Sequence, residues 1–128
     1  MDIKIPVDIE FSSQFIVEEK HTAAKLGSGL LEVLSTPAMI AWMEKTSMET
    51  IQRFLPEGYG SVGVLVNVEH LKATPIGKTV ICTAKVFSVD NRKISFKVTA
   101  KQEDEIIGRG FHDRFIINNE KFLKKISD

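Results

Sequence analysis

The stretch STPAMIAWMEKTSMETIQRFL, residues 35–55, predicts one amphipathic helix with a carboxylate set into its apolar side. Thr36 is expected to cap the helix start, since a Thr side chain accepts a hydrogen bond from a free backbone N–H, and Pro37 suits the first helical position. Residues at three-and-four spacing indicate the face turned to a core: Ile40, Met43, Ser47, Ile51, Phe54 and Leu55. Glu44 falls within that stripe, so its carboxylate needs a partner.

Length and composition limit the classes of protein to consider. A chain of 128 residues fits one domain, predicted over residues 1–128. Seventeen basic residues balance seventeen acidic ones, so no global field draws in nucleic acid or an anionic membrane. No apolar run approaches the ~18 residues of a membrane span, and residues 1–10 lack a signal-peptide core, so a cytoplasmic protein is expected. The single cysteine, Cys82, excludes an internal disulfide and is expected to be a small buried hydrophobe.

Residues 61–71, SVGVLVNVEHL, predict a half-buried strand. Five residues occupy alternate positions on one expected face: Val62, Val64, Val66, Val68 and His70. Period-two alternation is typical of a strand with one face toward a core. His70 is therefore expected on the core side, with the four valines.

The rest of the chain predicts four more strands, over residues 11–17, 79–89, 93–101 and 106–117, with turn chemistry at 90–92 and 102–105. Gly108 and Gly110 suggest a bulge or a close backbone approach in the last strand. The polar passage 18–29 has no clear period and is expected to be a flexible connector or lid; its KLGSG segment, residues 25–29, lacks the ending of a P-loop.

The order of strand, helix and four strands predicts an antiparallel sheet with one long helix on its inner face, an α+β architecture. The four late strands are expected to pair as a meander, with the first strand inserted or added at an edge.

If the helix packs on the valine face, Glu44 and His70 point into the same layer, where each can stabilise the charged form of the other. Such a pair can orient a water molecule or act as general base and acid. Thr36 adds a hydroxyl at the helix start, where the dipole favours negative charge. Thr36 and Glu44 are eight residues apart, or ~12 Å along a helix. Both can therefore serve one small group only if the substrate spans this gap or a homodimer interface forms a composite site.

Each candidate also has a purely structural interpretation. A buried His is more often a hydrogen-bonded core residue, a Glu on an apolar stripe can reach the edge of that stripe, and Thr36 alone is an N-cap. His21 is expected to be solvated. His112 and Arg114 are expected at a surface or edge position of the last strand.

At these residues the sequence resembles the hot-dog fold thioesterases of the fluoroacetyl-CoA thioesterase-like family. The resemblance covers roughly residues 11–122 and is most specific in VLSTPAMIAWME (33–44), GSVGVLVNVEH (60–70), ATPIG (73–77) and GFHDR (110–114). It implies a sheet of about five strands wrapped around one long central helix. The catalytic Thr, Glu and His of the family match Thr36, Glu44 and His70 with their spacing preserved. A family Gly whose N–H helps to place the thioester carbonyl or the water matches Gly63.

The resemblance implies an acyl-CoA thioesterase that hydrolyses a short- or medium-chain acyl-CoA to a carboxylic acid and free CoA. Glu44 would be nucleophile or general base, His70 the proton carrier and Thr36 an orienting or polarising hydroxyl. The acyl-CoA sites would lie at a homodimer interface, and association of two dimers into a tetramer stays open. CoA is part of the substrate, so no cofactor and no metal is expected, and neither nucleic acid nor a membrane is an expected partner.

The passage before the helix departs from the family pattern. The segment 24–31, AKLGSGLL, is shorter than the corresponding segment of the fluoroacetyl-specific enzyme and lacks its lid phenylalanines. A general short- or medium-chain acyl-CoA is therefore expected rather than fluoroacetyl selectivity, and loop 27–29 is expected to border the pocket. Two other functions stay open: a non-catalytic hot-dog module that binds acyl-CoA, and a hot-dog dehydratase or hydratase.

Overall fold

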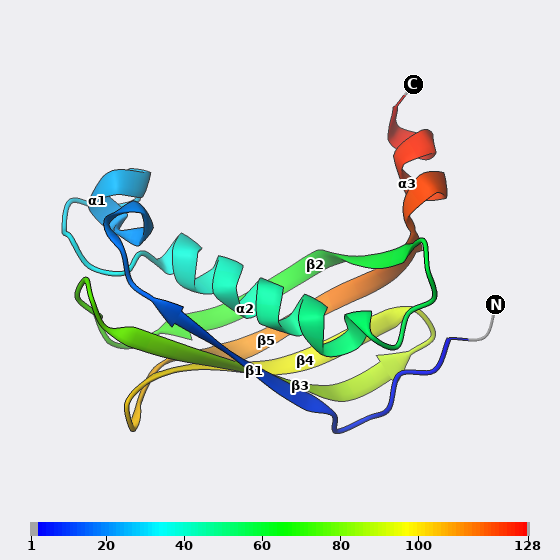
Figure 1. The fold of residues 1–128 in the computed structure, drawn as a ribbon, viewed down its shortest axis with the longest axis horizontal. Coiled ribbons are helices and arrows are strands. Elements are labelled where there is room, and N and C mark those ends of the chain that lie inside the picture. The colour runs from blue at the N-terminus through cyan, green and yellow to red at the C-terminus, as the bar shows by residue number, and fades with distance from the viewer. Residues whose placement is uncertain (1–2, 128) are drawn as a thin grey trace.

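A computed structural model describes residues 3–127, and Figure 1 shows a long helix lying across one face of a five-stranded antiparallel sheet. The elements follow in the order β1 (Glu10–Ile16), η1 (Glu19–His21), α1 (Ala23–Leu26), α2 (Thr36–Gln52), β2 (Tyr59–His70), β3 (Thr79–Asp90), β4 (Lys93–Gln102), β5 (Glu105–Asn118) and α3 (Asn119–Ile126). The predicted α+β architecture is confirmed.

The strand order β1-β3-β4-β5-β2 corrects the expected four-strand meander. Strands β3, β4 and β5 do form a meander, through turns in which Asn91 and Glu103 adopt positive φ angles of 59° and 54°. Strand β2 pairs with β5 instead of β3 and lies at one edge, while β1 pairs with β3 at the other. Residues 71–78 separate β2 from β3, so this link is too long for a tight hairpin and carries the chain across the sheet.

Helix α2 has a different cap from the expected one. The Ser35 hydroxyl accepts a hydrogen bond from the Ala38 N–H at 3.1 Å, so Ser35 is the N-cap and Thr36 is already helical. The Thr36 side chain is therefore free to make another contact. The helix ends at Gln52, three residues before the expected end.

The core lies between α2 and the sheet. The helix buries chiefly Met39, Met43, Trp42 and Ile51, together with three small polar residues whose hydroxyls donate to carbonyls four residues back: Thr46, Ser47 and Thr50. The sheet contributes fully buried residues from β3 and β4: Val80, Cys82, Ala84, Val86, Ile94, Phe96, Val98 and Ala100. Burial raises the pKa of Cys82 to about 12, as fits the expected small buried hydrophobe.

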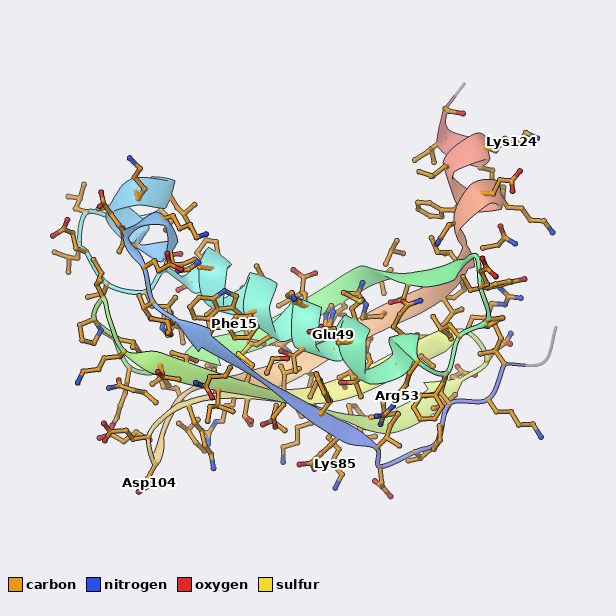
Figure 2. The ribbon with its side chains drawn as sticks, in the orientation of Figure 1. Phe15, Glu49, Arg53, Lys85, Asp104 and Lys124 are labelled. Carbon is orange, nitrogen blue, oxygen red and sulfur yellow. The ribbon has the colours of Figure 1, made fainter. Side chains whose placement is uncertain are left out.

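The passage after β1 is more regular than the expected connector. It holds η1 and α1, where the Thr22 hydroxyl accepts from the Lys25 N–H and Gly27 ends the helix with a φ of 83°. Trp42 is stacked on Phe15, which Figure 2 places alongside α2, with ring centroids 4.8 Å apart. The His21 ring meets the edge of Trp42 at 4.9 Å, so His21 packs against the helix and is not simply solvated.

Helix α3 extends from the end of β5, and Figure 1 shows it pointing away from the layered body. None of its described residues is buried, and Lys124 lies on this projection (Figure 2). Within residues 3–127, no helix has both the length and the apolar character needed to cross a membrane.

Candidate active site

A break in register decides which residues of β2 face the helix. The pairing with β5 shifts between Gly63 and Leu65, so Val64 is an inserted residue. Before the shift, Ser61 and Gly63 oppose Ile116 and Arg114, which are buried; after it, Val66 opposes the buried His112. The expectation of one valine face along the whole strand is therefore wrong. The inserted residue moves every earlier side chain to the other side of the sheet, so Val62 lies opposite to the face that carries Val66 and His70. Gly63 lies on the helix side, whereas Val64 is 58% exposed.

Thr36 and His70 form one half of the candidate site. Thr36 Oγ1 and His70 Nδ1 are 2.8 Å apart, a hydrogen bond between the first residue of α2 and the last residue of β2. Burial lowers the pKa of His70 below 6.5, and a backbone hydrogen bond with Lys72 offsets part of this shift. His70 Nε2 is buried without a side-chain partner in hydrogen-bonding geometry among the described residues.

The Thr36–His70 pair borders a cavity of about 340 Å³. Ser28 lines the same cavity, which confirms that loop 27–29 borders the pocket. The other lining residues come from α1, the start of α2 and the segment after β2: Ala23, Val33, Leu34, Ser35, Pro37, Leu71, Lys72 and Ala73. Leu30 and Leu31, which follow this loop, are 94% and 69% exposed.

Glu44 forms the other half, about two turns along α2. A Cβ placed on Gly63 would lie 2.8 Å from Glu44 Oε2, so the carboxylate fills the space that only a glycine leaves open. The same Cβ position is 3.0 Å from His112 Cε1 and 3.5 Å from Arg114 Nη1. The expected Glu44–His70 pair does not form within the protomer. The side chains around Glu44 are His112 and Arg114 instead.

His112 and Arg114 are buried, at 1% and 7% exposure, which corrects the surface position expected for them. The Leu65 carbonyl can only accept, so His112 Nδ1, 2.8 Å away, carries the proton. His112 Nε2 is then the acceptor for Arg114 Nη1–H at 3.2 Å. Arg114 also donates through Nε to the Ser61 hydroxyl at 2.8 Å and through Nη2 to the Ser61 carbonyl at 2.9 Å. These bonds fix the guanidinium beside Glu44.

Electrostatics follow from this burial. Burial is the main cause that lowers the pKa of Arg114, and the charge of Glu44 opposes it. Burial also lowers the pKa of His112, which the hydrogen bond to Leu65 partly offsets. The sequence gives no clear signal for this pair: Ile116 lies in phase with His112 and Arg114, but Phe111, Phe115 and Ile117 make the other face at least as apolar.

The two halves together offer acid–base chemistry. One half supplies a hydroxyl and an imidazole at a cavity, and the other supplies a carboxylate beside a guanidinium and a glycine backbone. Among residues 3–127, no group of three or more His, Cys, Asp or Glu side chains is arranged to hold a metal ion.

Comparison with known proteins identifies the family. The model of the family described as "Fluoroacetyl-CoA-specific thioesterase" matches residues 17–120. The fluoroacetyl-CoA thioesterase of Streptantibioticus cattleyicolor is 39% identical over 95 residues, which cover 74% of this chain and 68% of that protein.

Solved structures agree. The fluoroacetyl-CoA thioesterase FlK matches with a TM-score of 0.91 at 33% identity, over 96% of both chains. A variant of that enzyme, in complex with fluoroacetate and CoA, matches with a TM-score of 0.87 at 34% identity, over 92% of this chain and 99% of that one. A hot-dog-like protein from Thermanaerovibrio acidaminovorans matches with a TM-score of 0.86 at 25% identity, over 94% and 90%. The chain therefore belongs to the fluoroacetyl-CoA-specific thioesterase family, a group of thioester hydrolases built on the hot-dog fold.

Proposed function

We propose that this protein hydrolyses a short- or medium-chain acyl-CoA to a carboxylic acid and free CoA. The observation that carries the proposal is the Thr36–His70 hydrogen bond of 2.8 Å at the edge of a cavity, with Nε2 of the same imidazole left without a side-chain partner. A neutral imidazole in this position is suited to move one proton during thioester cleavage. Membership of a thioesterase family supports the same reaction.

Each site residue has a distinct proposed role. The Glu44 carboxylate either attacks the thioester carbonyl or takes a proton from the attacking water. In both cases the neutral His70 ring accepts the proton that the water loses, directly or from Glu44, and the resulting imidazolium delivers it to the sulfur of CoA. Thr36 orients the imidazole or polarises the reacting group. The Gly63 backbone N–H has the proposed role of supporting the carbonyl oxygen or the water. Its strand position lies beside Glu44, whose carboxylate a Cβ on Gly63 would displace. Arg114 supplies positive charge beside Glu44.

A homodimer with composite sites joins the two halves. Thr36 and Glu44 are ~12 Å apart along α2. Strand β2 is a sheet edge with exposed apolar residues, among them Val64, Leu65 and Val66, and such edges invite pairing. Antiparallel pairing of two β2 edges about a two-fold axis brings the His70 end of one strand toward the Glu44 half of the other subunit.

Light scattering at assay concentration tests the dimer. The expected mass is that of two chains, and a tetramer would show twice that mass. Val64→Asp places a charge at this edge and is expected to produce monomers with little activity. A wild-type monomer with full activity would contradict the composite site.

The substrate range follows from the loop before α2. Leu30 is 94% exposed, and the passage 24–31 contains no aromatic residue that could close over a fluoroacetyl group. We therefore expect kcat/KM for fluoroacetyl-CoA and acetyl-CoA to agree within about tenfold, a difference of ~1.4 kcal/mol. Straight-chain substrates from acetyl- to octanoyl-CoA would locate the preferred length.

Release of free thiol from this panel is the central test. Glu44→Gln and His70→Ala are each expected to lower kcat by about 10²-fold or more while the circular dichroism spectrum is retained. Glu49→Gln is the matched control, because Glu49 lies on the same helix in an exposed ion pair with Lys45. Saturable acyl-CoA binding without thiol release would favour the non-catalytic module. A change in enoyl absorbance without thiol release would favour a dehydratase or hydratase.

The proposed chemistry uses only side chains, the backbone and water, so no cofactor or metal is included. Dialysis against EDTA is expected to leave kcat unchanged. We place the reaction in the cytoplasm, and cell fractionation with an antibody to the native protein tests this location.

A further inference from the structure

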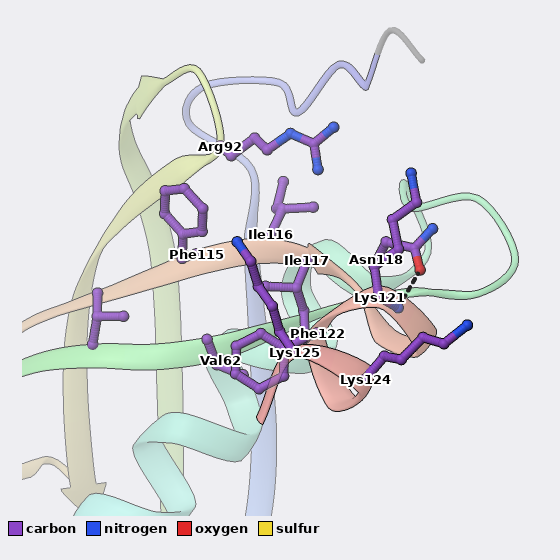
Figure 3. A pocket seen from close by; sticks show the side chains of 11 residues that line it. Val62, Arg92, Phe115, Ile116, Ile117, Asn118, Lys121, Phe122, Lys124 and Lys125 are labelled. Atoms are coloured by element: carbon purple, nitrogen blue, oxygen red, sulfur yellow. Dashed lines mark hydrogen bonds between the residues drawn. The ribbon is translucent and has the colours of Figure 1, made fainter. Parts of the chain in front are cut away.

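A second, larger groove lies where α3 leaves the sheet. It has a volume of about 850 Å³ and is lined by β2, β5, α3 and Arg92 in the turn between β3 and β4. Six lining residues are large and apolar: Val62, Val64, Phe115, Ile116, Ile117 and Phe122. Figure 3 shows β2 and β5 beside α3, with the cationic side chains of the groove around them.

The cations of the groove are Arg92, Lys121, Lys124 and Lys125. None of the four forms an ion pair with any residue in the described range 3–127. Arg92 lies over the ring of Tyr59, 5.8 Å from its centroid. The charges of Arg92 and Lys121 both act on the Tyr59 hydroxyl, whose pKa is lowered chiefly by a hydrogen bond with the Asn118 side chain. Positive charge from two separate elements therefore converges beside an apolar floor.

We propose that this groove binds the nucleotide end of acyl-CoA, with the phosphates on the cations and the adenine on the apolar floor. The inference rests on the proposed function, because an acyl-CoA substrate carries an adenine and three phosphates at the end remote from the thioester. Lysine and arginine are the usual partners of phosphate, and aromatic and aliphatic side chains accept the faces of a base.

The groove serves the active site of the other subunit. Within one chain, Val62 lies in the groove and His70 lies eight residues further along β2, ~26 Å away at ~3.3 Å per residue. In a dimer that pairs β2 edges antiparallel, the groove end of one strand lies beside the His70 end of the other. Each acyl-CoA then places its thioester at the Thr36–His70 pair of one subunit and its phosphates on α3 of the partner.

Removal of the α3 charges tests the groove. The variant K121A/K124A/K125A is expected to raise KM for acetyl-CoA by about tenfold or more at low salt, with kcat unchanged, and high salt is expected to narrow this difference. Acetyl-pantetheine lacks the nucleotide, so its kinetics are expected to be the same in both proteins. The control K85A/K97A/K101A removes three exposed charges from β3 and β4 and is expected to alter neither substrate.

Adenosine 3′,5′-diphosphate is a direct binding probe that requires no hydrolysis. Calorimetry is expected to show binding to wild type that the α3 variant loses and the control keeps. If wild type binds this probe but cleaves no acyl-CoA, the proposed function fails while the groove stands. If the α3 variant loses activity equally with acetyl-CoA and acetyl-pantetheine, or keeps the wild-type KM for both, the proposed nucleotide site is wrong. A shift of the α3 variant to monomers would also overturn it, since the helix would then be a contact between copies.

Mixed dimers test whether the groove of one subunit serves the active site of the other. In one dimer, Thr36→Val and the three lysine changes are on the same chain. In the second dimer, they are on opposite chains. The single active site that survives in the first is expected to have the raised KM, and in the second the wild-type KM. The reverse pattern would assign the groove to the active site of its own chain.

Discussion

Glu44 Oε2 lies 2.8 Å from the point at which a Cβ on Gly63 would stand, so the carboxylate and the glycine backbone occupy one shared space. The contact depends on the inserted Val64, which turns Gly63 toward the helix. A local irregularity in an edge strand thus positions the one carboxylate of the candidate site.

Gly63→Ala is expected to displace Glu44 and lower kcat/KM by at least about tenfold, and to destabilise the fold by ~1–3 kcal/mol because the added methyl group overlaps packed atoms. Kinetics and urea unfolding measure the two effects. Lys97→Ala, an exposed position on β4 and away from the proposed dimer edge, is the control. Wild-type kinetics in Gly63→Ala would show that Glu44 need not touch this backbone.

Thr36→Val keeps the shape of the side chain and removes the hydroxyl that bonds to His70. We expect kcat to fall by about 10–10²-fold, because the imidazole loses its orienting partner. Thr36→Ser retains the hydroxyl and is expected to recover most of the activity. Equal losses in the two variants would mean that the methyl group, not the hydrogen bond, matters.

The pH dependence of kcat/KM follows from the burial of His70. Burial lowers its pKa below 6.5, so more than half of the rings are neutral at pH 6.5. Activity that needs the neutral ring is therefore expected to fall with an acid limb centred below pH 6.5. An acid limb centred above pH 6.5 would contradict this assignment.

His112→Phe removes the acceptor of Arg114 Nη1 and the donor to the Leu65 carbonyl. The unpaired carbonyl is expected to cost ~1–3 kcal/mol of unfolding free energy, and kcat is expected to fall as Arg114 loses its position. The acid limb of the wild-type profile should persist in this variant, because it belongs to His70.

The same variant tests a pH effect on stability. The pKa of His112 is lowered in the folded state, so the unfolded chain binds more protons once the pH drops below 6.5. The contribution of this residue is present above pH 6.5 and is lost as the pH falls. Urea unfolding at pH 7.5 and 5.5 is expected to show a smaller difference for His112→Phe than for wild type.

Periodicity alone predicted the helix, the strands and the burial of Cys82, because regular alternation reports which face meets a core. It failed at Val64, where one extra residue moves Val62 to the outer face and Gly63 to the helix side. It also paired Glu44 with His70, because alternation indicates which face a side chain lies on but not which helix residue it meets, and His70 meets Thr36. It also failed at His112 and Arg114, since polar side chains on an inner face are hydrogen-bonded there by partners distant in the sequence. The family pattern still placed Thr36 and His70, which meet across 34 positions of the chain.

The burial of Cys82 has a practical consequence for the thiol-release assay. A thiol without exposed surface and with a pKa of about 12 carries almost no thiolate near neutral pH, so disulfide reagents that react with released CoA find no competing sulfur on the folded protein. Unfolding uncovers that one sulfur. The same colour reaction that counts turnovers thus also counts unfolded molecules, one per chain.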